Sequence, residues 1–394
     1  MNAVESTRTS RMSTVMREGE RVTPLELFFD LVFVLALTQC TTLMAHSPTW
    51  AELLKGMLIL ALLWWSWVGY AWLTSVIDPE AGPVRLAMFA AMAALLVVAL
   101  CVPGAFGNEA LLFACAYAVV RASHIILFSI ASREDAALRR SVAGLGLGTA
   151  FGAGLLLAGA LAGATMQLVL WTLALALDMG EPFLFGAEGW KLMPKHFAER
   201  HGLIVIIALG ESIVALGVGA QASISAGLVA AAVLGMVVAA ALWWAYFDVA
   251  ALVAEQRLSQ SQAGRQRNEM ARDAYSYLHF PMVAGIALFA VGLKRTLGHV
   301  EAPLEPVPAV ALLGGTAMYL LAQVAFRLRN VHTLAGRRVI CAGALLALVP
   351  ITVGLGISSL ATLAILAAAL TGMIAYEVLR FAEARARIRG GIST

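Results

Sequence analysis

Charged residues are scarce in this chain of 394 residues. Asp, Glu, Lys and Arg together make up 13% of it, whereas they make up about 25% of an average soluble domain. Hydrophobic residues account for 61% of the chain, against about 45–50% in soluble domains. This balance excludes an ordinary soluble domain and predicts an all-α, polytopic membrane protein.

Metal-binding motifs and a cleavable leader are also lacking, and cysteine is rare. The four cysteines lie inside apolar runs without CxxC spacing, which is typical of small buried hydrophobic side chains. No His, Cys, Asp or Glu residues recur at a strong metal-ligand spacing, so neither a metal nor another cofactor is expected. The first apolar run begins only after Met1–Arg21 and has no convincing small-residue cleavage site, which argues against a signal peptide.

Long apolar stretches dominate the rest of the chain. A helix that crosses a bilayer needs about 20 mostly apolar residues, and twelve stretches meet this requirement. The fifth and sixth of them are nearly continuous around residues 159–165. We expect spans at residues 24–45, 51–73, 84–103, 110–131, 138–160, 164–182, 201–219, 224–250, 274–293, 304–326, 338–356 and 359–379.

The positions of the basic residues predict which side each loop faces, because Lys and Arg near span ends concentrate on the cytoplasmic side. With twelve spans, 23 of the 27 Lys and Arg residues lie on one side. Three lie on the other side, namely Lys55, Lys294 and Arg295, and Arg121 lies within the fourth span. We therefore predict a multi-pass protein of the cell (cytoplasmic) membrane with both termini in the cytoplasm.

Three short matches indicate an internal duplication. Residues 31–39 align with 203–211, residues 63–67 align with 242–246, and the pair 139–140 aligns with 337–338, in the same order. Six helices is an even number, so two six-helix repeats would share one orientation, with sites near their interface. The predicted organisation is a cytoplasmic tail, a first repeat, a connector, a second repeat and a C-terminal tail, at residues 1–21, 22–182, 183–200, 201–379 and 380–394.

The first span contains two acidic residues. Glu26 and Asp30 are four positions apart, so they share one face of the helix. An Asp at the centre of a membrane helix costs about 2.5–3.5 kcal/mol. Both acids are therefore expected to face protein or water, and each is a candidate functional residue.

Further polar residues lie in later spans. Arg121 is predicted to be the counter-ion of a buried acid, either Asp30 or Asp178, because an unpaired buried charge is costly. The candidates around the seventh span are Glu199, Arg200 and His201 at its start and Glu211 and Ser212 near its middle. Each could instead be a structural residue, and acids near helix ends could simply reach the lipid headgroups.

Two stretches resemble the signatures of a known family. Residues 22–34, Val-Thr-Pro-Leu-Glu-Leu-Phe-Phe-Asp-Leu-Val-Phe-Val, and residues 196–214, which include His-Gly-Leu and Gly-Glu-Ser, are similar to those of the bacterial low temperature requirement A family. The resemblance implies an integral membrane protein linked to growth in the cold, without an established biochemical activity. It singles out Pro24, Glu26, Phe29, Asp30, Glu199, Arg200, His201, Gly202, Gly210, Glu211 and Ser212.

A fainter similarity links the first span to a channel family. Phe28-Phe29-Asp30 resembles the Phe-Ser-Asp motif of potassium channels whose two-repeat members also have twelve spans. Here Phe29 stands in the place of the serine, and His201-Gly202-Leu203 in the second repeat includes no acid. Both departures argue against a shared channel mechanism.

We expect an ion channel or an ion- or proton-coupled transporter. Asp30 and Glu211 would line or gate a path between the repeats, and Glu26, Glu199 and His201 would lie at its cytoplasmic mouth. Membrane lipids and a monovalent cation or proton are the expected partners. A homo-oligomer is compatible with the sequence, and no nucleic acid is expected.

Two alternatives stay open. One is a membrane-embedded enzyme acting on a lipid or isoprenoid, with His201 and either Glu199 or Glu211 as acid and base. No nucleophile arrangement supports it, and we assign no catalytic residue. The other is a structural or sensory membrane protein whose buried charges only hold the helices together.

Overall fold

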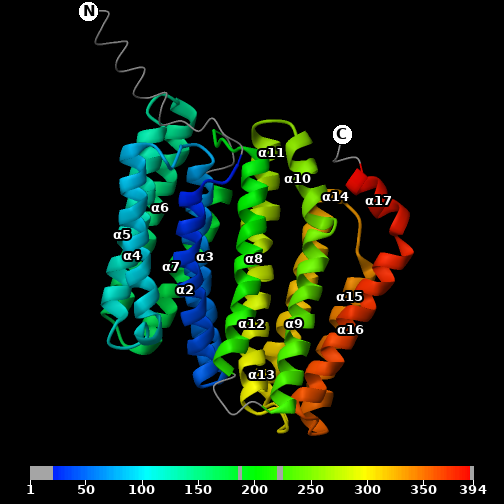
Figure 1. Cartoon of the computed structure of the whole chain (residues 1–394). Coiled ribbons are helices and arrows are strands. Elements are labelled where there is room, and N and C mark those ends of the chain that lie inside the picture. The colour runs from blue at the N-terminus through cyan, green and yellow to red at the C-terminus, as the bar shows by residue number, and fades with distance from the viewer. Residues whose placement is uncertain (1–20, 185–188, 220–224, 391–394) are drawn as a thin grey trace, which may run out of the picture. The chain divides into compact units, whose positions relative to one another are not determined.

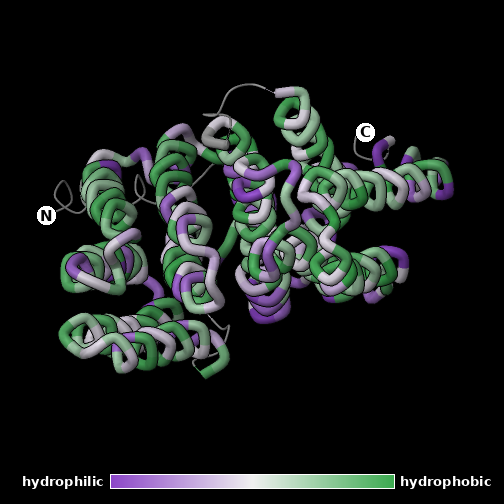
Figure 2. Tube along the Cα trace, turned by 90° about the horizontal axis from the view of Figure 1, so that it is seen from below, coloured by the Kyte–Doolittle hydropathy of each residue, from purple (hydrophilic) through white to green (hydrophobic). Residues whose placement is uncertain are grey.

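The fold is helical throughout the part of the chain that the structure describes. The computed structural model describes residues 21–184, 189–219 and 225–390, where the only β-type pairing is an isolated bridge between Pro303 and Ser358. Eleven helical stretches in these residues are long and apolar enough to cross a membrane. Hydrophobic positions cover most of each long helix (Figure 2). The chain is therefore a multi-pass membrane protein.

Long helices follow one another closely in the amino-terminal half (Figure 1). Their backbone N–H and C=O groups pair within each helix, as the interior of a bilayer requires. The elements are α2 (Pro24–His46), α3 (Trp50–Thr74), α4 (Gly82–Cys101), the short η1 (Val102–Gly104), α5 (Ala110–Ala131), α6 (Ala136–Ala160) and α7 (Ala164–Leu184).

The carboxy-terminal half mixes long helices with short ones. Two of its segments, η2 and η3, have π-helical hydrogen bonding. The elements are α8 (Pro194–Gly219), α9 (Ala226–Phe247), α10 (Ala250–Gln260), α11 (Arg265–Met270), η2 (Ala271–Tyr277), α12 (His279–Gly298), α13 (Pro306–Ala309), η3 (Val310–Gly314), α14 (Gly315–Val331), α15 (Gly336–Gly354), α16 (Ser359–Arg380) and α17 (Ala382–Gly390).

The count of twelve spans is not established, because α7 is not among the eleven apolar stretches. This helix has 21 residues and coincides with the sixth predicted span. It contains Gln167, Asp178 and Glu181, all buried, which reduce its hydropathy. The predicted break near residues 159–165 corresponds to the turn between Ala160 and Ala164.

The seventh predicted span starts too late in the sequence. Residue 201 was the expected first residue, but α8 begins at Pro194. Proline is tolerated in the first helical turn, where its missing N–H removes no hydrogen bond. As a result His196 and Arg200, which are four positions apart, lie on one face of a helix and not in a connector.

Two compact units make up the described chain. The first takes its residues from Met1–Cys40, Leu54–Arg200 and Ser261–Arg272, and the second from Thr41–Leu53, His201–Gln260 and Asp273–Thr394. In the first unit α4 packs on α5, α5 on α6 and α6 on α7. In the second unit α12 packs on α14, α14 on α15 and α9 on α16. Helices α2 and α8 each contribute residues to both units.

Glycine permits the closest helix contact in the second unit. A Cβ atom on Gly285 of α12 would lie 2.6 Å from the carbonyl oxygen of Gly315 on α14. A side chain at either position would therefore separate the two helices. Small residues bring helices together in this way in membrane proteins, where burial away from water does not drive helix association.

Candidate functional site

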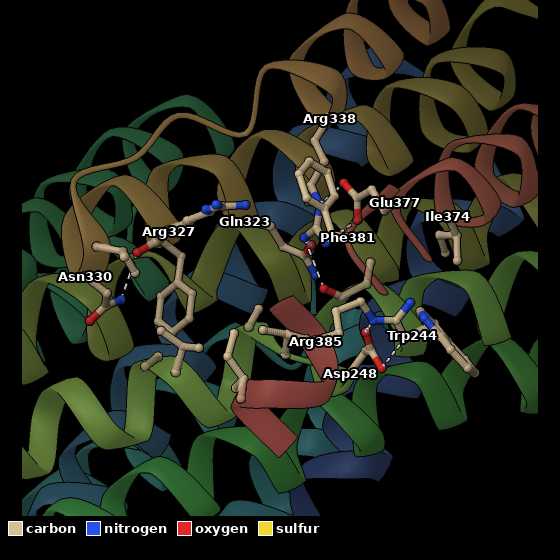
Figure 3. Close-up of a pocket in the computed structure, with 18 of the residues that line it drawn as sticks. Trp244, Asp248, Gln323, Arg327, Asn330, Arg338, Ile374, Glu377, Phe381 and Arg385 are labelled. Atoms are coloured by element: carbon tan, nitrogen blue, oxygen red, sulfur yellow. Dashed lines mark hydrogen bonds and ion pairs between the residues drawn. The ribbon is translucent and has the colours of Figure 1, made fainter. Parts of the chain in front are cut away.

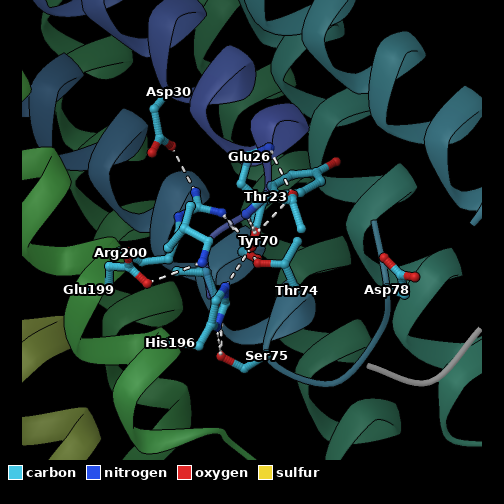
Figure 4. Close-up of polar contacts among 12 residues, drawn as sticks. Thr23, Glu26, Asp30, Tyr70, Thr74, Ser75, Asp78, His196, Glu199 and Arg200 are labelled. Carbon is cyan, nitrogen blue, oxygen red and sulfur yellow. Dashed lines mark hydrogen bonds and ion pairs between the residues drawn. The ribbon is translucent and has the colours of Figure 1, made fainter. Parts of the chain in front are cut away.

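The most heavily charged buried group of the first unit joins α2 to the start of α8 (Figure 4). We call it the Arg200 cluster, and it consists of Glu26, Asp30, His196 and Arg200. Arg200 donates from Nη1 to Glu26 Oε1 at 3.0 Å and from Nη2 to Asp30 Oδ1 at 2.8 Å. All four side chains are fully buried. One guanidinium therefore contacts both carboxylates.

Hydrogen bonds at the start of α2 fix the position of the Glu26 side chain. Its Oε2 atom accepts hydrogen bonds from the backbone N–H and the hydroxyl of Thr23, at 2.8 and 3.1 Å. In turn the Glu26 N–H lies 3.4 Å from the Thr23 hydroxyl. This is the reciprocal capping arrangement of a Thr-x-x-Glu helix start. One carboxylate oxygen is thus used locally, and the other, Oε1, points to Arg200 and His196.

His196 extends the cluster through both of its ring nitrogens. Nε2 lies 2.8 Å from Glu26 Oε1, and Nδ1 lies 3.1 Å from the Ser75 hydroxyl. The Ser75 hydroxyl donates its own hydrogen to the carbonyl of Ala71 at 3.1 Å. With its hydrogen on that carbonyl, the hydroxyl can accept a hydrogen bond from Nδ1 in the tautomer that carries the proton there.

In this tautomer a proton is also needed between His196 and Glu26. An ionised carboxylate is only an acceptor, and a neutral imidazole has only one N–H. Since Nδ1 already holds the N–H of a neutral ring, the 2.8 Å contact of Nε2 with Oε1 needs an additional proton. That proton makes the cluster electrically neutral, with two acids, Arg200 and one further positive charge. Without it the buried charge is −1.

Asp30 has one oxygen that is not used. Oδ1 accepts from Arg200 and from the indole N–H of Trp67, both at 2.8 Å. Oδ2 is buried and has no hydrogen-bond partner among the described residues. The Arg200 guanidinium also lies over the Trp67 ring, 5.5 Å from its centroid, and donates to Thr74 at 3.3 Å. A buried acceptor without a donor is costly, which makes Oδ2 a place for a proton or a cation.

A second charged group lies in the second unit, and we call it the Glu211 cluster. Glu211 Oε1 accepts from the ammonium of Lys294 at 2.9 Å and from the Thr41 hydroxyl at 2.5 Å. Lys294 also donates to Thr41 Oγ1 at 2.7 Å. Glu211 is fully buried, whereas the Lys294 side chain is 10% exposed. Thr41 belongs to α2 and Glu211 to α8, the helices that also supply the Arg200 cluster.

The other candidates lie elsewhere. Glu199 is exposed and accepts from the backbone N–H of Val22 at 3.1 Å. His201 packs its ring edge against Tyr275 and His279, with centroids 5.3 and 5.2 Å apart. Ser212 is buried, and its hydroxyl has no partner within the described part of the chain.

Arg121 pairs with an acid of its own unit. Its guanidinium lies 3.5 Å from Asp178, one of the two acids proposed for it, and donates to the Thr149 hydroxyl at 2.8 Å. The hydrogen bonds and ion pairs described for the Arg200 cluster do not include Arg121. Asp178 lies on α7, so this ion pair links α5 to α7.

Three residues of these clusters were missed from the sequence. His196 was placed in a connector, although its spacing of four from Arg200 would have put both on one helical face. Lys294 was counted as a loop charge, and Thr41 has no sequence signal of its own. Within residues 21–184, 189–219 and 225–390, no three His, Cys, Asp or Glu side chains are arranged to hold a metal ion.

Sequence matches to known proteins cover most of the chain. Residues 21–375 match the family described as Bacterial low temperature requirement A protein (LtrA). The chain is also similar to uncharacterized protein RA0937 of Rhizobium meliloti (strain 1021). The two sequences are 30% identical over 311 residues, and this aligned region covers 75% of the present chain and 74% of the relative. No solved structure matches the chain significantly.

Proposed function

The chain belongs to the bacterial low temperature requirement A family, and from this premise we propose that it is a proton-coupled ion transporter of the cell membrane. The observation that supports this most strongly is the 2.8 Å contact between His196 Nε2 and Glu26 Oε1 in the fully buried Arg200 cluster, a place where the two side chains can share a proton. Charged groups inside membrane proteins are rare, and they mark ion and proton pathways.

The charge of the cluster supports coupling of a proton to a cation. With the proton in place the two acids are balanced by Arg200 and the imidazolium, and a cation is not attracted. When the proton leaves, the buried charge of −1 favours a monovalent cation near Asp30, whose Oδ2 has no donor among the described residues. Binding of the proton and binding of the cation would thus exclude each other, which is the requirement for exchange.

Arg200 would set the selectivity of this site. Its guanidinium stays charged at any physiological pH, and it contacts both acids directly. It therefore prevents two cations from binding at once and limits the site to one charge. We propose that the Glu211 cluster, with its own buried charge pair, is a second candidate ion site.

Orientation and organisation are part of the proposal. We propose that both termini lie in the cytoplasm, because 23 basic residues lie on one side of the predicted spans. We also propose that the chain consists of two tandem six-helix repeats. With this orientation, Glu26 and Asp30 in the first two turns of α2 would lie near the cytoplasmic end of the helix.

Ion flux in proteoliposomes tests the proposal. Potassium, sodium and proton gradients would be imposed on the full chain and on Asp30→Asn, with Glu134→Gln as the control because Glu134 is an exposed acid outside the clusters. We expect Asp30→Asn to abolish the flux and Glu134→Gln to leave it unchanged. Flux that persists in folded Asp30→Asn under every gradient would refute the assignment.

The dependence of the flux on pH tests the shared proton. His196→Gln retains a polar side chain but cannot take up a proton. We expect any remaining flux of this variant to vary less with pH between about 5 and 8, the range in which histidine ordinarily titrates. An unchanged pH profile of the His196→Gln variant would show that the proton between His196 and Glu26 takes no part in the transport step.

A further inference from the structure

The second unit contains a cavity of about 290 Å³ that no residue of the Glu211 cluster lines (Figure 3). It is formed by α9, α10, α14, α15, α16 and α17, and its lining includes Trp244, Phe326 and Phe381. The volume is at the lower end of the roughly 300–1,000 Å³ of small-molecule sites. The space therefore suits a small polar group better than a whole lipid.

The charges that line this cavity do not cancel. Arg338 holds Glu377 through two hydrogen bonds of 3.1 and 3.0 Å, and Arg385 of α17 holds Asp248 at 2.7 Å. The fifth charged residue of the lining is Arg327, which is exposed and donates from Nε to the Thr333 hydroxyl at 3.0 Å. Three arginines against two acids give the lining a surplus of one positive charge.

Two buried side chains of the lining offer free hydrogen-bonding atoms. Gln323 is 2% exposed and Asn330 is 4% exposed. Gln323 Oε1 accepts from Arg338, and Asn330 Nδ2 donates to the Phe326 carbonyl at 2.8 Å. Asn330 Oδ1 has no partner among the described residues, and Gln323 Nε2 has only an interaction with the Tyr319 side chain. The cavity thus presents one donor and one acceptor, as well as its positive charge.

An apolar groove leads from this cavity along α9 and α16. Its volume is about 530 Å³, and its lining includes Ala240, Ala241 and Leu379. It shares Trp244, Ile374 and Val378 with the cavity, so the two spaces adjoin. Ala240, Ala375 and Leu379 are exposed. On membrane-spanning helices, exposed apolar side chains contact lipid chains, so the groove suits an acyl chain.

We propose that the cavity binds the headgroup of an anionic glycerophospholipid of the phosphatidylglycerol type, with an acyl chain in the groove. Its single negative charge balances the surplus arginine. A phosphate oxygen accepts from Gln323 Nε2 and Arg327, and a glycerol hydroxyl donates to Asn330 Oδ1. Phosphatidylcholine has no headgroup donor for Asn330, and phosphatidylethanolamine is zwitterionic and leaves the positive charge unbalanced.

The C-terminal helix completes the site. Arg385 of α17 lines the cavity, and it also donates a hydrogen bond to Asp248, the residue that directly follows α9. The basic composition of α17, with Arg385, Arg387 and Arg389, also favours an anionic membrane surface. This inference is independent of the transport proposal, because no residue of either charged cluster lines the cavity.

Thermal unfolding of the full chain in detergent, with added lipid, tests the site. We expect phosphatidylglycerol to raise the unfolding temperature by several degrees, and phosphatidylcholine, phosphatidylethanolamine and soluble glycerol 3-phosphate to raise it much less. The double variant Gln323→Leu/Asn330→Leu should lose the shift. The matched control Asn108→Leu/Gln262→Leu changes the same residue types at exposed positions and should keep it.

Several outcomes would overturn the assignment. Equal shifts with phosphatidylethanolamine would refute the anionic headgroup, and an equal shift with glycerol 3-phosphate would refute a lipid ligand. Retention of the shift in Gln323→Leu/Asn330→Leu would refute the cavity as the site.

A measurement on the unmodified chain guards against a double variant that fails to fold. Phosphatidylglycerol with a photoreactive diazirine in one acyl chain would be crosslinked and mapped by mass spectrometry. We expect crosslinks to concentrate within residues 237–244 and 371–379. Crosslinks spread evenly over the lipid-facing helices would refute the groove.

Discussion

Arg200 and Asp30 form a buried ion pair, with Nη2 and Oδ1 2.8 Å apart and both side chains fully buried, although 170 positions separate them in the sequence. Arg200 contacts Glu26 as well, so its removal would leave Asp30 without the guanidinium and Glu26 with His196 as its charged neighbour. Removing one member of a buried pair costs about 3–5 kcal/mol.

We therefore expect Arg200→Gln to lower the free energy of unfolding by about 3–5 kcal/mol, measured by denaturant titration in mixed micelles. Asp30→Asn in the Arg200→Gln background should restore part of the loss, because it removes one uncompensated charge. The control is Arg265→Gln, which breaks the exposed pair with Glu269 and should cost less than about 1 kcal/mol. Strictly additive effects of Asp30→Asn and Arg200→Gln would contradict a direct pair.

The Glu211 cluster should respond unequally to the loss of its two charges. Lys294→Met leaves Glu211 fully buried without a cation, so we expect a loss of about 3 kcal/mol or more in unfolding free energy. Glu211→Gln should cost less, because the Lys294 side chain is 10% exposed and its ammonium can reach water. The neighbouring change Arg295→Met serves as a control. Equal costs for both cluster variants would argue against the buried pair.

Gly148 of α6 leaves room for an acid of α7. A Cβ atom at this position would overlap Oε1 of Glu181, so we expect Gly148→Ala to lower the unfolding free energy by about 1–3 kcal/mol. Gly154→Ala, where a Cβ atom meets nothing within 4 Å, should stabilise the helix by up to about 1 kcal/mol. Adding Glu181→Ala should rescue Gly148→Ala, and a failure to rescue would place the clash elsewhere.

Asp135 links stability to pH at the start of α6. The hydrogen bond from Lys191, together with the N–H groups of Leu138 and Ala137, holds the pKa of Asp135 below its usual range. A lowered pKa stabilises the folded state at pH values above the unfolded pKa near 3.8. This contribution is lost as the pH falls through the folded-state pKa.

We expect Asp135→Asn to retain the helix cap but to remove this acid-induced loss, and Asp135→Ala to lose the cap, at a cost of about 0.5–2 kcal/mol. Unfolding temperatures between pH 3 and pH 7 would measure both effects. If Asp135→Asn showed the same pH dependence as the unchanged chain, another group would be responsible.

The amino-acid sequence determined much of the fold. Apolar stretches of about 20 residues must form helices in a bilayer, because every backbone polar group has to be paired within the segment. For this reason most predicted spans lie within a few residues of the observed helices. The spacing of Glu26 and Asp30 also placed both acids on one helical face, where the structure has them contact one guanidinium.

Only the tertiary structure decided which groups meet. Helical periodicity tells which residues share a face, but it does not tell which way that face turns or which distant helix it contacts. The pairing of Asp30 with Arg200 and not with Arg121, the inclusion of His196, and the capture of Lys294 by Glu211 all depend on how the helices rotate and pack. That packing results from the shapes of many side chains together, such as Gly148 beneath Glu181, and no short motif specifies it.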